Sequence, residues 1–198
     1  ISMICGQLRQ DAGQIYVNGR NTLKNMNAIK QDIGVVFQNS VLDRQLSVQD
    51  NLKNRAALYG ITGKAFQKRL FELDDLLELR PLLKQSVGKL SGGQRQALAL
   101  IIATMSDIDL LILDEHTAAL DPKSSETLMR ITDKVVKEKH LTTLMVTHNL
   151  RFAVEYGSRL IMMHGGKAVM DIDGEQKKDL VVDDILGKFN EISIECGN

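Results

Sequence analysis

The residues best placed to do chemistry are two neighbouring acids, Asp114 and Glu115, which follow the apolar run 110–113. That run is continuous rather than alternating, which predicts a parallel strand buried on both faces. Such strands present ligands at their carboxyl ends. There Asp114 can hold Mg²⁺, which takes oxygen ligands, and Glu115 can polarise an attacking water. A lone Asp-Glu pair after a core strand is more often an acidic turn, so the rest of the chain must decide.

The segment Ser91-Gly92-Gly93-Gln94 predicts the start of a helix. Ser91 is a preferred N-cap residue, and Gln94 follows three positions later, as a capping box requires. Gly92 and Gly93 carry no side chain, so another backbone or a phosphate can approach the exposed amides of the helix start. Taken by itself, the segment is more often a well-capped helix than a phosphate site.

Three more polar residues stand where strands or loops end. Asp121 precedes Pro122, which predicts an N-cap followed by proline at the first helical position. Gln38 follows the apolar strand predicted over 33–37, and His148 follows the strand predicted to end at 147. Read alone, Gln38 is a polar loop residue and His148 a structural histidine.

Together the stretches LSGGQRQ, LLILDEHTAALD and VTHN resemble, in order and spacing, the ATP-binding cassette (ABC) ATPases, the nucleotide-hydrolysing subunits of ABC transporters. The resemblance implies ATP and Mg²⁺ as cofactors. It implies that Asp114 is the Walker B aspartate and Glu115 the catalytic base. His148 matches the switch histidine that contacts the γ-phosphate, and Gln38 the Q-loop glutamine that touches Mg²⁺ or its water.

The same resemblance assigns the segment 91–94 to the signature loop, which clamps the γ-phosphate held by a second ATPase subunit. Asp121 matches the D-loop, which packs against its counterpart in the dimer. His116 departs from the family, where proline is common. It is expected to be a surface variant with no catalytic role.

No G-x-x-x-x-G-K-[ST] phosphate loop occurs in the chain. In the family the loop is followed by a short helix ending in isoleucine, any residue, glycine, which corresponds to Ile4-Cys5-Gly6. The expectation is therefore a fragment that begins just past its phosphate loop. The full protein is predicted to be an ATPase, whereas the chain as given is predicted to be inactive.

Composition agrees with a globular ATPase domain. The chain has 198 residues, 43% of them apolar, and 25 basic residues balance 25 acidic ones, so no net field favours nucleic acid. Cys5 and Cys196 lie at opposite ends without metal-ligand spacing, which predicts free thiols in a reducing cytosol. The longest apolar run, 97–103, is far shorter than the ~18 residues that a membrane span requires.

The fold expected is α/β: a P-loop NTPase-like ABC core with a mostly parallel sheet, forming a single domain over 1–198. Strands at 14–18 and 33–37 are expected in a small antiparallel β subdomain. A helical subdomain is expected over 40–89, with an apolar stripe of core residues on its second helix: Phe66, Leu70, Leu73, Leu76 and Leu77. Beyond it we expect a helix over 122–138, a hairpin of 159–164 with 167–172, and a closing helix over 182–194.

The resemblance also implies partners: a transmembrane permease, a second ATPase subunit and, for an importer, a solute-binding protein. It places the chain in the cytoplasm, on the inner face of the membrane through the permease. The stretch 33–52 looks like the ATPases of drug or polysaccharide exporters. The longer stretch from 113 onward is similar to importers of amino acids or similar solutes, and import is preferred. An ABC protein acting on ribosomes or DNA would have paired cassettes or a coiled-coil insertion, and neither occurs here. A fragment that binds a partner without turnover is the other alternative.

Overall fold

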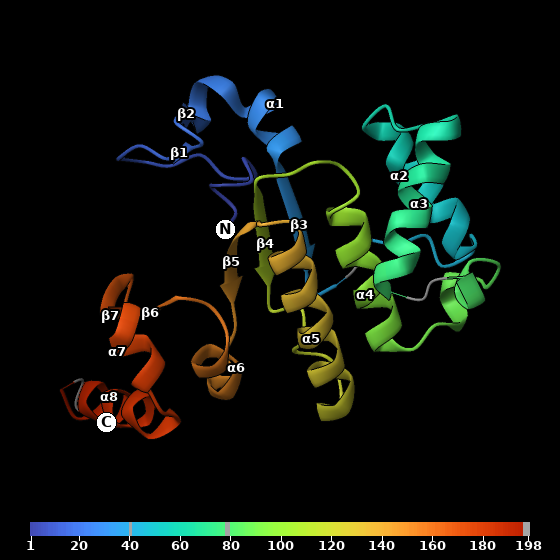
Figure 1. Ribbon diagram of the computed structural model, residues 1–198. Coiled ribbons are helices and arrows are strands. Elements are labelled where there is room, and N and C mark those ends of the chain that lie inside the picture. The colour runs from blue at the N-terminus through green and yellow to red at the C-terminus, as the bar shows by residue number, and fades with distance from the viewer. Residues whose placement is uncertain (40, 78–79, 196–198) are drawn as a thin grey trace. The chain divides into compact units, whose positions relative to one another are not determined.

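The computed structural model describes residues 1–39, 41–77 and 80–195, with the side chains of 75–77 and 193–195 left out. The chain forms two compact units, Ile1–Val146 and Thr147–Asn198 (Figure 1). Cys5 is a free thiol whose pKa is raised, chiefly by burial. Cys196 lies outside the described residues, so the prediction for its thiol remains a prediction. The single-domain assignment for 1–198 likewise remains a prediction.

The first unit is built on a parallel sheet of three strands, β3 (Ile33–Phe37), β4 (Leu110–Asp114) and β5 (Thr142–Val146), in the order β3-β4-β5. The prediction of a strand buried on both faces is confirmed for β4, because its three central residues are at most 1% exposed. The prediction that 33–37 joins a small antiparallel sheet is wrong. Ile-Gly-Val-Val-Phe is apolar without alternation, as suits a strand covered on both faces, and β3 pairs in parallel with β4.

Helices cover one face of this sheet. α4 (Gly92–Ala103) and α5 (Pro122–Glu138) pack on the face that carries Val36, Leu111 and Leu113. The other face carries Ile33 and Ile112, which share a core with α1 (Thr22–Asp32) and with the hairpin of β1 (Tyr16–Val17) and β2 (Arg20–Asn21). A small antiparallel sheet is thus present, formed by β1 and β2.

The described residues of the range 40–89 form two helices, α2 (Val48–Leu58) and α3 (Gly63–Leu77), and two 3₁₀ turns, Arg80–Leu82 and Val87–Lys89. Ser47 caps α2, and its side chain accepts from the Asp50 amide. The apolar stripe of α3 is core packing as far as it is described. Its buried members Phe66, Leu70 and Leu73 share a core with Leu98 and Ile101 of α4 and with Met105, which follows that helix. The side chains of Leu76 and Leu77 lie outside the description.

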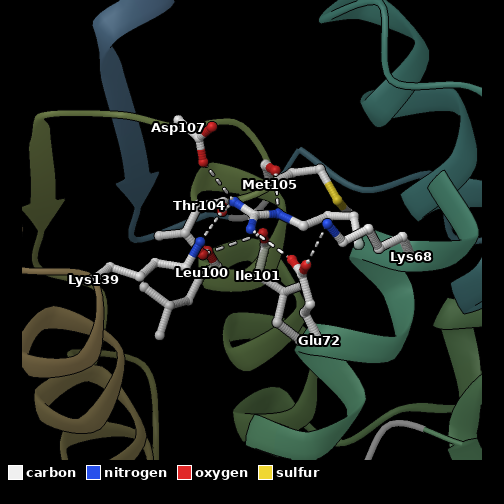
Figure 2. A network of polar contacts seen from close by, with 9 residues as sticks. Lys68, Glu72, Leu100, Ile101, Thr104, Met105, Asp107 and Lys139 are labelled. Atoms are coloured by element: carbon white, nitrogen blue, oxygen red, sulfur yellow. Dashed lines mark hydrogen bonds and ion pairs between the residues drawn. The ribbon is translucent and has the colours of Figure 1, made fainter. Parts of the chain in front are cut away.

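A polar network ties α3 to the C-terminal end of α4 (Figure 2). Arg69 on α3 donates hydrogen bonds to the carbonyl oxygens of Met105 (2.7 Å) and Thr104 (3.4 Å). Lys139, at the end of α5, donates to the same Thr104 oxygen (2.9 Å). The last carbonyls of a helix have no partner inside the helix, so cations there satisfy the acceptors and complement the helix dipole. Burial, and next the neighbouring Arg69, lower the pKa of Lys139.

The second unit has a core formed by α6 (Leu150–Glu155), β6 (Arg159–His164), β7 (Lys167–Asp173) and α8 (Val182–Glu195), and α7 (Gly174–Asp179) lies between β7 and α8 in the chain. The predicted hairpin is confirmed, since β6 and β7 pair antiparallel. Gly165 and Gly166 both have positive φ, as the tight turn between such strands requires. The closing helix is confirmed as α8.

Candidate functional site

Sheet register brings three of the predicted site residues to one edge. Asp114 is the last residue of β4 and lies opposite Phe37 of β3 and Val146 of β5. Gln38 therefore leaves β3 beside the point where Glu115 leaves β4. Because all three strands are parallel, this is the carboxyl edge of the sheet, where α/β proteins bind their ligands.

Glu115 has an unusual backbone. Its φ is +49°, in the left-handed region that residues with a Cβ seldom adopt. The conformation is held on both sides, since the Glu115 amide donates to the Val146 carbonyl (3.0 Å) and its own carbonyl accepts from the Ala118 amide (3.0 Å). The chain thus turns sharply out of β4 at the proposed base. Strained residues of this kind cluster at functional sites.

The start of α4 has the predicted capping box. The Ser91 hydroxyl accepts from the Gln94 amide (3.2 Å), and the Gln94 side-chain oxygen accepts from the Ser91 amide (2.9 Å). Ser91 and Gln94 are exposed, so the positive end of the helix faces solvent. The capping prediction is confirmed, whereas phosphate binding by this segment stays a prediction.

Gly92 and Gly93 allow a close approach within the chain itself. A Cβ added to Gly92 would lie 3.1 Å from Leu120, and one added to Gly93 would lie 3.1 Å from the Cβ of Ser124. The glycines therefore let the start of α4 lie against the loop that leads into α5. The neighbours at these positions are the side chains of Leu120 and Ser124, so the predicted approach of another backbone or a phosphate stays a prediction.

Asp121 caps α5, with Pro122 at the first helical position, as predicted. Its carboxylate accepts from the Ser124 amide (3.0 Å). Hydrogen bonds from the Ser124 hydroxyl and amide hold the pKa of Asp121 below its usual value. Asp121 is thus ionised next to the signature segment at neutral pH.

The prediction that His116 is a surface residue is wrong. Only 2% of His116 is exposed, and burial lowers its pKa to about 4, so the ring is neutral at pH 7. Its Nε2 lies 3.4 Å from the hydroxyl of Thr132 on α5. His116 thus fills the space between the end of β4 and α5.

Sequence reasoning missed Gln96, two residues beyond Gln94. It is 6% exposed, and its side-chain amide donates to the backbone oxygens of Phe37 (3.3 Å) and Gln38. A signal was available, because Gln96 shares a helix face with Leu100 and Ala103, and a polar residue on an apolar face needs a partner.

His148 lies two residues past β5, in the second unit, beside Asn149, which caps α6. Its role stays a prediction. Within the described residues no group of three or more histidines, cysteines or acids could hold a metal ion. Mg²⁺ needs fewer, since it is commonly bound by one or two carboxylates together with phosphates and waters. The carboxylate of Asp114 and the amide oxygen of Gln38 are hard oxygen donors that fit this ion.

These features define a protein of the open α/β class with a ligand edge formed by β3 and β4. The chain belongs to the ABC transporter family, whose model matches residues 1–118. It is 41% identical to the tyrosine transport ATP-binding protein of Clostridioides difficile, over 96% of this chain and 79% of that protein. It spans a smaller share of other curated relatives, between 46% and 57% of their length.

Two solved structures share the fold. The protein cbiO1 from Clostridium perfringens, described as part of the ABC transporter complex cbiONQ, superposes with a TM-score of 0.80 at 21% identity, covering 97% of this chain and 75% of that one. The cassette MJ0796, solved as a dimer with ADP and Pi, has a TM-score of 0.72 at 26% identity, covering 87% and 78%. The chain is therefore an ABC ATPase in fold as well as in sequence. None of its described helices is long and apolar enough to cross a membrane.

Proposed function

We propose that this ABC ATPase powers the import of an amino acid or a similar small solute. The observation that carries the proposal is the shared carboxyl edge, where register brings together Gln38, Asp114 and Glu115. The 41%-identical relative is a tyrosine transport ATP-binding protein, which supports an amino acid as cargo. The resemblance to exporters over 33–52 remains the alternative that the experiment must exclude.

Each edge residue has a distinct task in this proposal. Asp114 and Gln38 hold the Mg²⁺ that accompanies ATP, using oxygen donors. Glu115 is the general base that accepts a proton from the attacking water, a contribution of about 10²–10⁴-fold to the rate. His148 contacts the γ-phosphate and helps to hold that water. The fixed turn at Glu115 supports this reading, because a base must be positioned before it can accelerate the reaction.

The exposed start of α4 supports a dimer in which each subunit completes the site of the other. The segment 91–94 presents the positive end of the helix dipole, and Gly92 and Gly93 carry no side chain that would keep a phosphate from the helix start. Asp121 stands at the neighbouring loop that would meet its counterpart. The structural relative MJ0796 is dimeric with ADP and Pi.

A permease is the second partner proposed. An apolar hollow of about 260 Å³ lies between β3, α2 and α4 and includes Val41, Leu58 and Tyr59 in its lining. Val41 and Leu58, which both line this hollow, are each 74% exposed. This surface, directly after Gln38, suits a helix of the permease. The ATPase would then sit on the cytoplasmic face of the membrane, with a solute-binding protein on the other side.

The experiment is Glu115→Gln in the assembled transporter, with an ATPase subunit that carries a phosphate loop. Steady-state phosphate release should fall ~10²–10⁴-fold while ATP still binds. Accumulation of labelled tyrosine by right-side-out vesicles should stop. Glu138→Gln, at the exposed end of α5, is the matched control and should transport normally.

Two results would contradict the proposal in different ways. Normal phosphate release by Glu115→Gln removes Glu115 from its role. Loss of labelled solute from loaded vesicles, in place of uptake, makes the transporter an exporter.

A further inference from the structure

Gln96 links two segments that serve different nucleotides. It lies on α4, two residues past the signature segment 91–94, and its amide donates to the backbone of Phe37 and Gln38. In the proposed dimer Gln38 acts on the nucleotide bound by its own subunit. The segment 91–94 acts on the nucleotide bound by the partner subunit.

The link is mechanically direct. Ser91, Gln94 and Gln96 lie within the first turns of one capped helix, and five residues of helix span only about 7.5 Å. A shift of the carbonyls that Gln96 holds is therefore passed to the signature segment without an intervening flexible loop. Gln96 is 6% exposed, so water does not compete freely for its donors.

The hydrogen-bond partners of the Gln96 side chain fix which way its amide group faces. Both neighbours are carbonyl oxygens, which accept only, so the NH₂ group must face them and the side-chain oxygen must point away. Within the described part of the chain that oxygen has no hydrogen-bond partner. Leu100 and Ala103, further along the same face, pack in the apolar core against Val36. The amide is thus a polar contact at the rim of a hydrophobic interface.

We propose that Gln96 is a positioning residue that couples the two nucleotide sites of the dimer, by joining the Gln38 loop to the signature helix of the same subunit. The inference rests on the proposed function. It predicts that loss of the amide uncouples the sites, so that each hydrolyses ATP without sensing the other.

The test compares Gln96→Met with the control Thr104→Val on the same helix. Methionine keeps the length and burial of glutamine but cannot donate. Thr104 is fully buried and donates to Leu100 within α4 (3.0 Å), so Thr104→Val removes a buried polar contact that does not reach residue 38. Both variants are assayed in the assembled transporter with a phosphate loop, against ATP concentration.

For Gln96→Met we expect the Hill coefficient for ATP, which can reach two in a dimer with two sites, to fall to about one. We also expect kcat to fall about tenfold with little change in KM. Amide exchange over 35–39 in the 198-residue chain should quicken about tenfold, the effect of losing a net hydrogen bond of ~1.4 kcal/mol. Thr104→Val should leave all three quantities unchanged.

An unchanged Hill coefficient and unchanged exchange in Gln96→Met would overturn the inference. If Gln96→Met does not fold, Gln96→Asn serves instead, because its shorter amide keeps the polarity but cannot reach both carbonyls. Failure of the proposed function would give a different result from failure of this inference, namely normal ATP turnover by the Glu115→Gln variant.

Discussion

The two edges of the parallel sheet differ in how their polar groups are used. At the carboxyl edge Asp114 and Glu115 are half-buried and Gln38 is exposed. At the amino edge the backbone groups are tied to one another: the Asp109 amide donates to Asp32 (2.9 Å), and the Asp109 carbonyl accepts from Thr142 (3.1 Å).

Side chains reinforce the amino edge. Asn18 donates to the Asp109 carboxylate (2.7 Å), and Arg20 pairs with Asp32 at 2.6 Å. The same three strands therefore present the proposed site residues at one edge, whereas at the other edge side-chain hydrogen bonds and an ion pair add to the backbone hydrogen bonds. Changes at the carboxyl edge should alter turnover, and changes at the amino edge should alter stability.

α4 connects the two edges. Its start lies by the carboxyl edge, where Gln96 reaches the backbone of Gln38, and its end lies by the amino edge, where Arg69 and Lys139 hold the carbonyl of Thr104. One helix thus has an active end and an anchored end. Changes along it should separate turnover from stability most clearly.

The largest effect is expected at the active end. Ser91→Arg places a bulky cation where the partner's γ-phosphate is proposed to lie, so hydrolysis should fall at least ~10²-fold and ATP-dependent dimerisation should be lost. Phosphate release and size-exclusion chromatography with ATP measure both. Ser47→Arg, the same change at the cap of α2, should cost about 1 kcal/mol of stability and keep turnover. A Ser91→Arg protein that dimerises and hydrolyses ATP normally would reduce Ser91 to a helix cap.

His116 should be an exception to the rule that changes at the carboxyl edge alter turnover, because it lies by that edge yet supports stability. Its folded pKa is about 4 against an ordinary 6.5, so the unfolded chain takes up the proton first as pH falls. The contribution is complete above pH 6.5 and is lost as pH falls to 4, by about 3 kcal/mol.

Urea unfolding of the wild type and His116→Gln between pH 7 and 4, in magnesium-free buffer, measures this contribution. The difference between the two proteins should shrink as pH falls. If the stability of the two proteins changed with pH in the same way, His116 would be protonated equally in the folded and unfolded states.

Gly34 tests, from the side of the amino edge, the expectation that changes there alter stability. A Cβ there would lie 2.3 Å from the Ala103 carbonyl oxygen and 2.6 Å from Ile108, so Gly34→Ala must push β3 and α4 apart. We expect a loss of about 2 kcal/mol of stability, measured by urea unfolding. Gly187→Ala in α8, where the added carbon meets nothing, should be neutral or stabilising. Unchanged stability in the Gly34→Ala protein would mean that the two elements are not closely packed.

The smallest effect is expected at the anchored end. Arg69→Met keeps the packing of the stem but removes the donors to Met105 and Thr104, which should cost about 1.5 kcal/mol of stability. Lys68→Met, its neighbour with an 82% exposed side chain and a 4.0 Å ion pair, should change stability by less than about 0.5 kcal/mol. Turnover per folded molecule should be normal in both. A selective loss of turnover in Arg69→Met would place the anchored end in the catalytic cycle.

Elements with strong end signals could be predicted from sequence. Ser91 with Gln94 and Asp121 with Pro122 carry the local chemistry of a helix start, so α4 and α5 begin where the residues indicate. β4 was also predictable, because few structures other than a parallel strand bury such a continuous apolar run. The edge residues followed from the strand ends.

Features that depend on distant packing could not be predicted. Which sheet β3 joins is decided by its pairing with β4, which lies far away in sequence. The burial of His116 is decided by where α5 crosses the end of β4, and nothing beside it in sequence reports that. The place of Gln96 on an apolar helix face signalled that it needs a partner, but the partners themselves could not be predicted, because they are backbone carbonyls, which every residue has.

Arg69 binds the main-chain oxygens of Thr104 and Met105 rather than their side chains, and this limits which substitutions can break the contact. Its acceptors at positions 104 and 105 are peptide oxygens, so almost any amino acid at either position could serve. Only the arginine itself and the path of the backbone are constrained. Substitution of the side chains at positions 104 and 105 should therefore leave the tie between α3 and the end of α4 intact, whereas substitution of Arg69 should remove it.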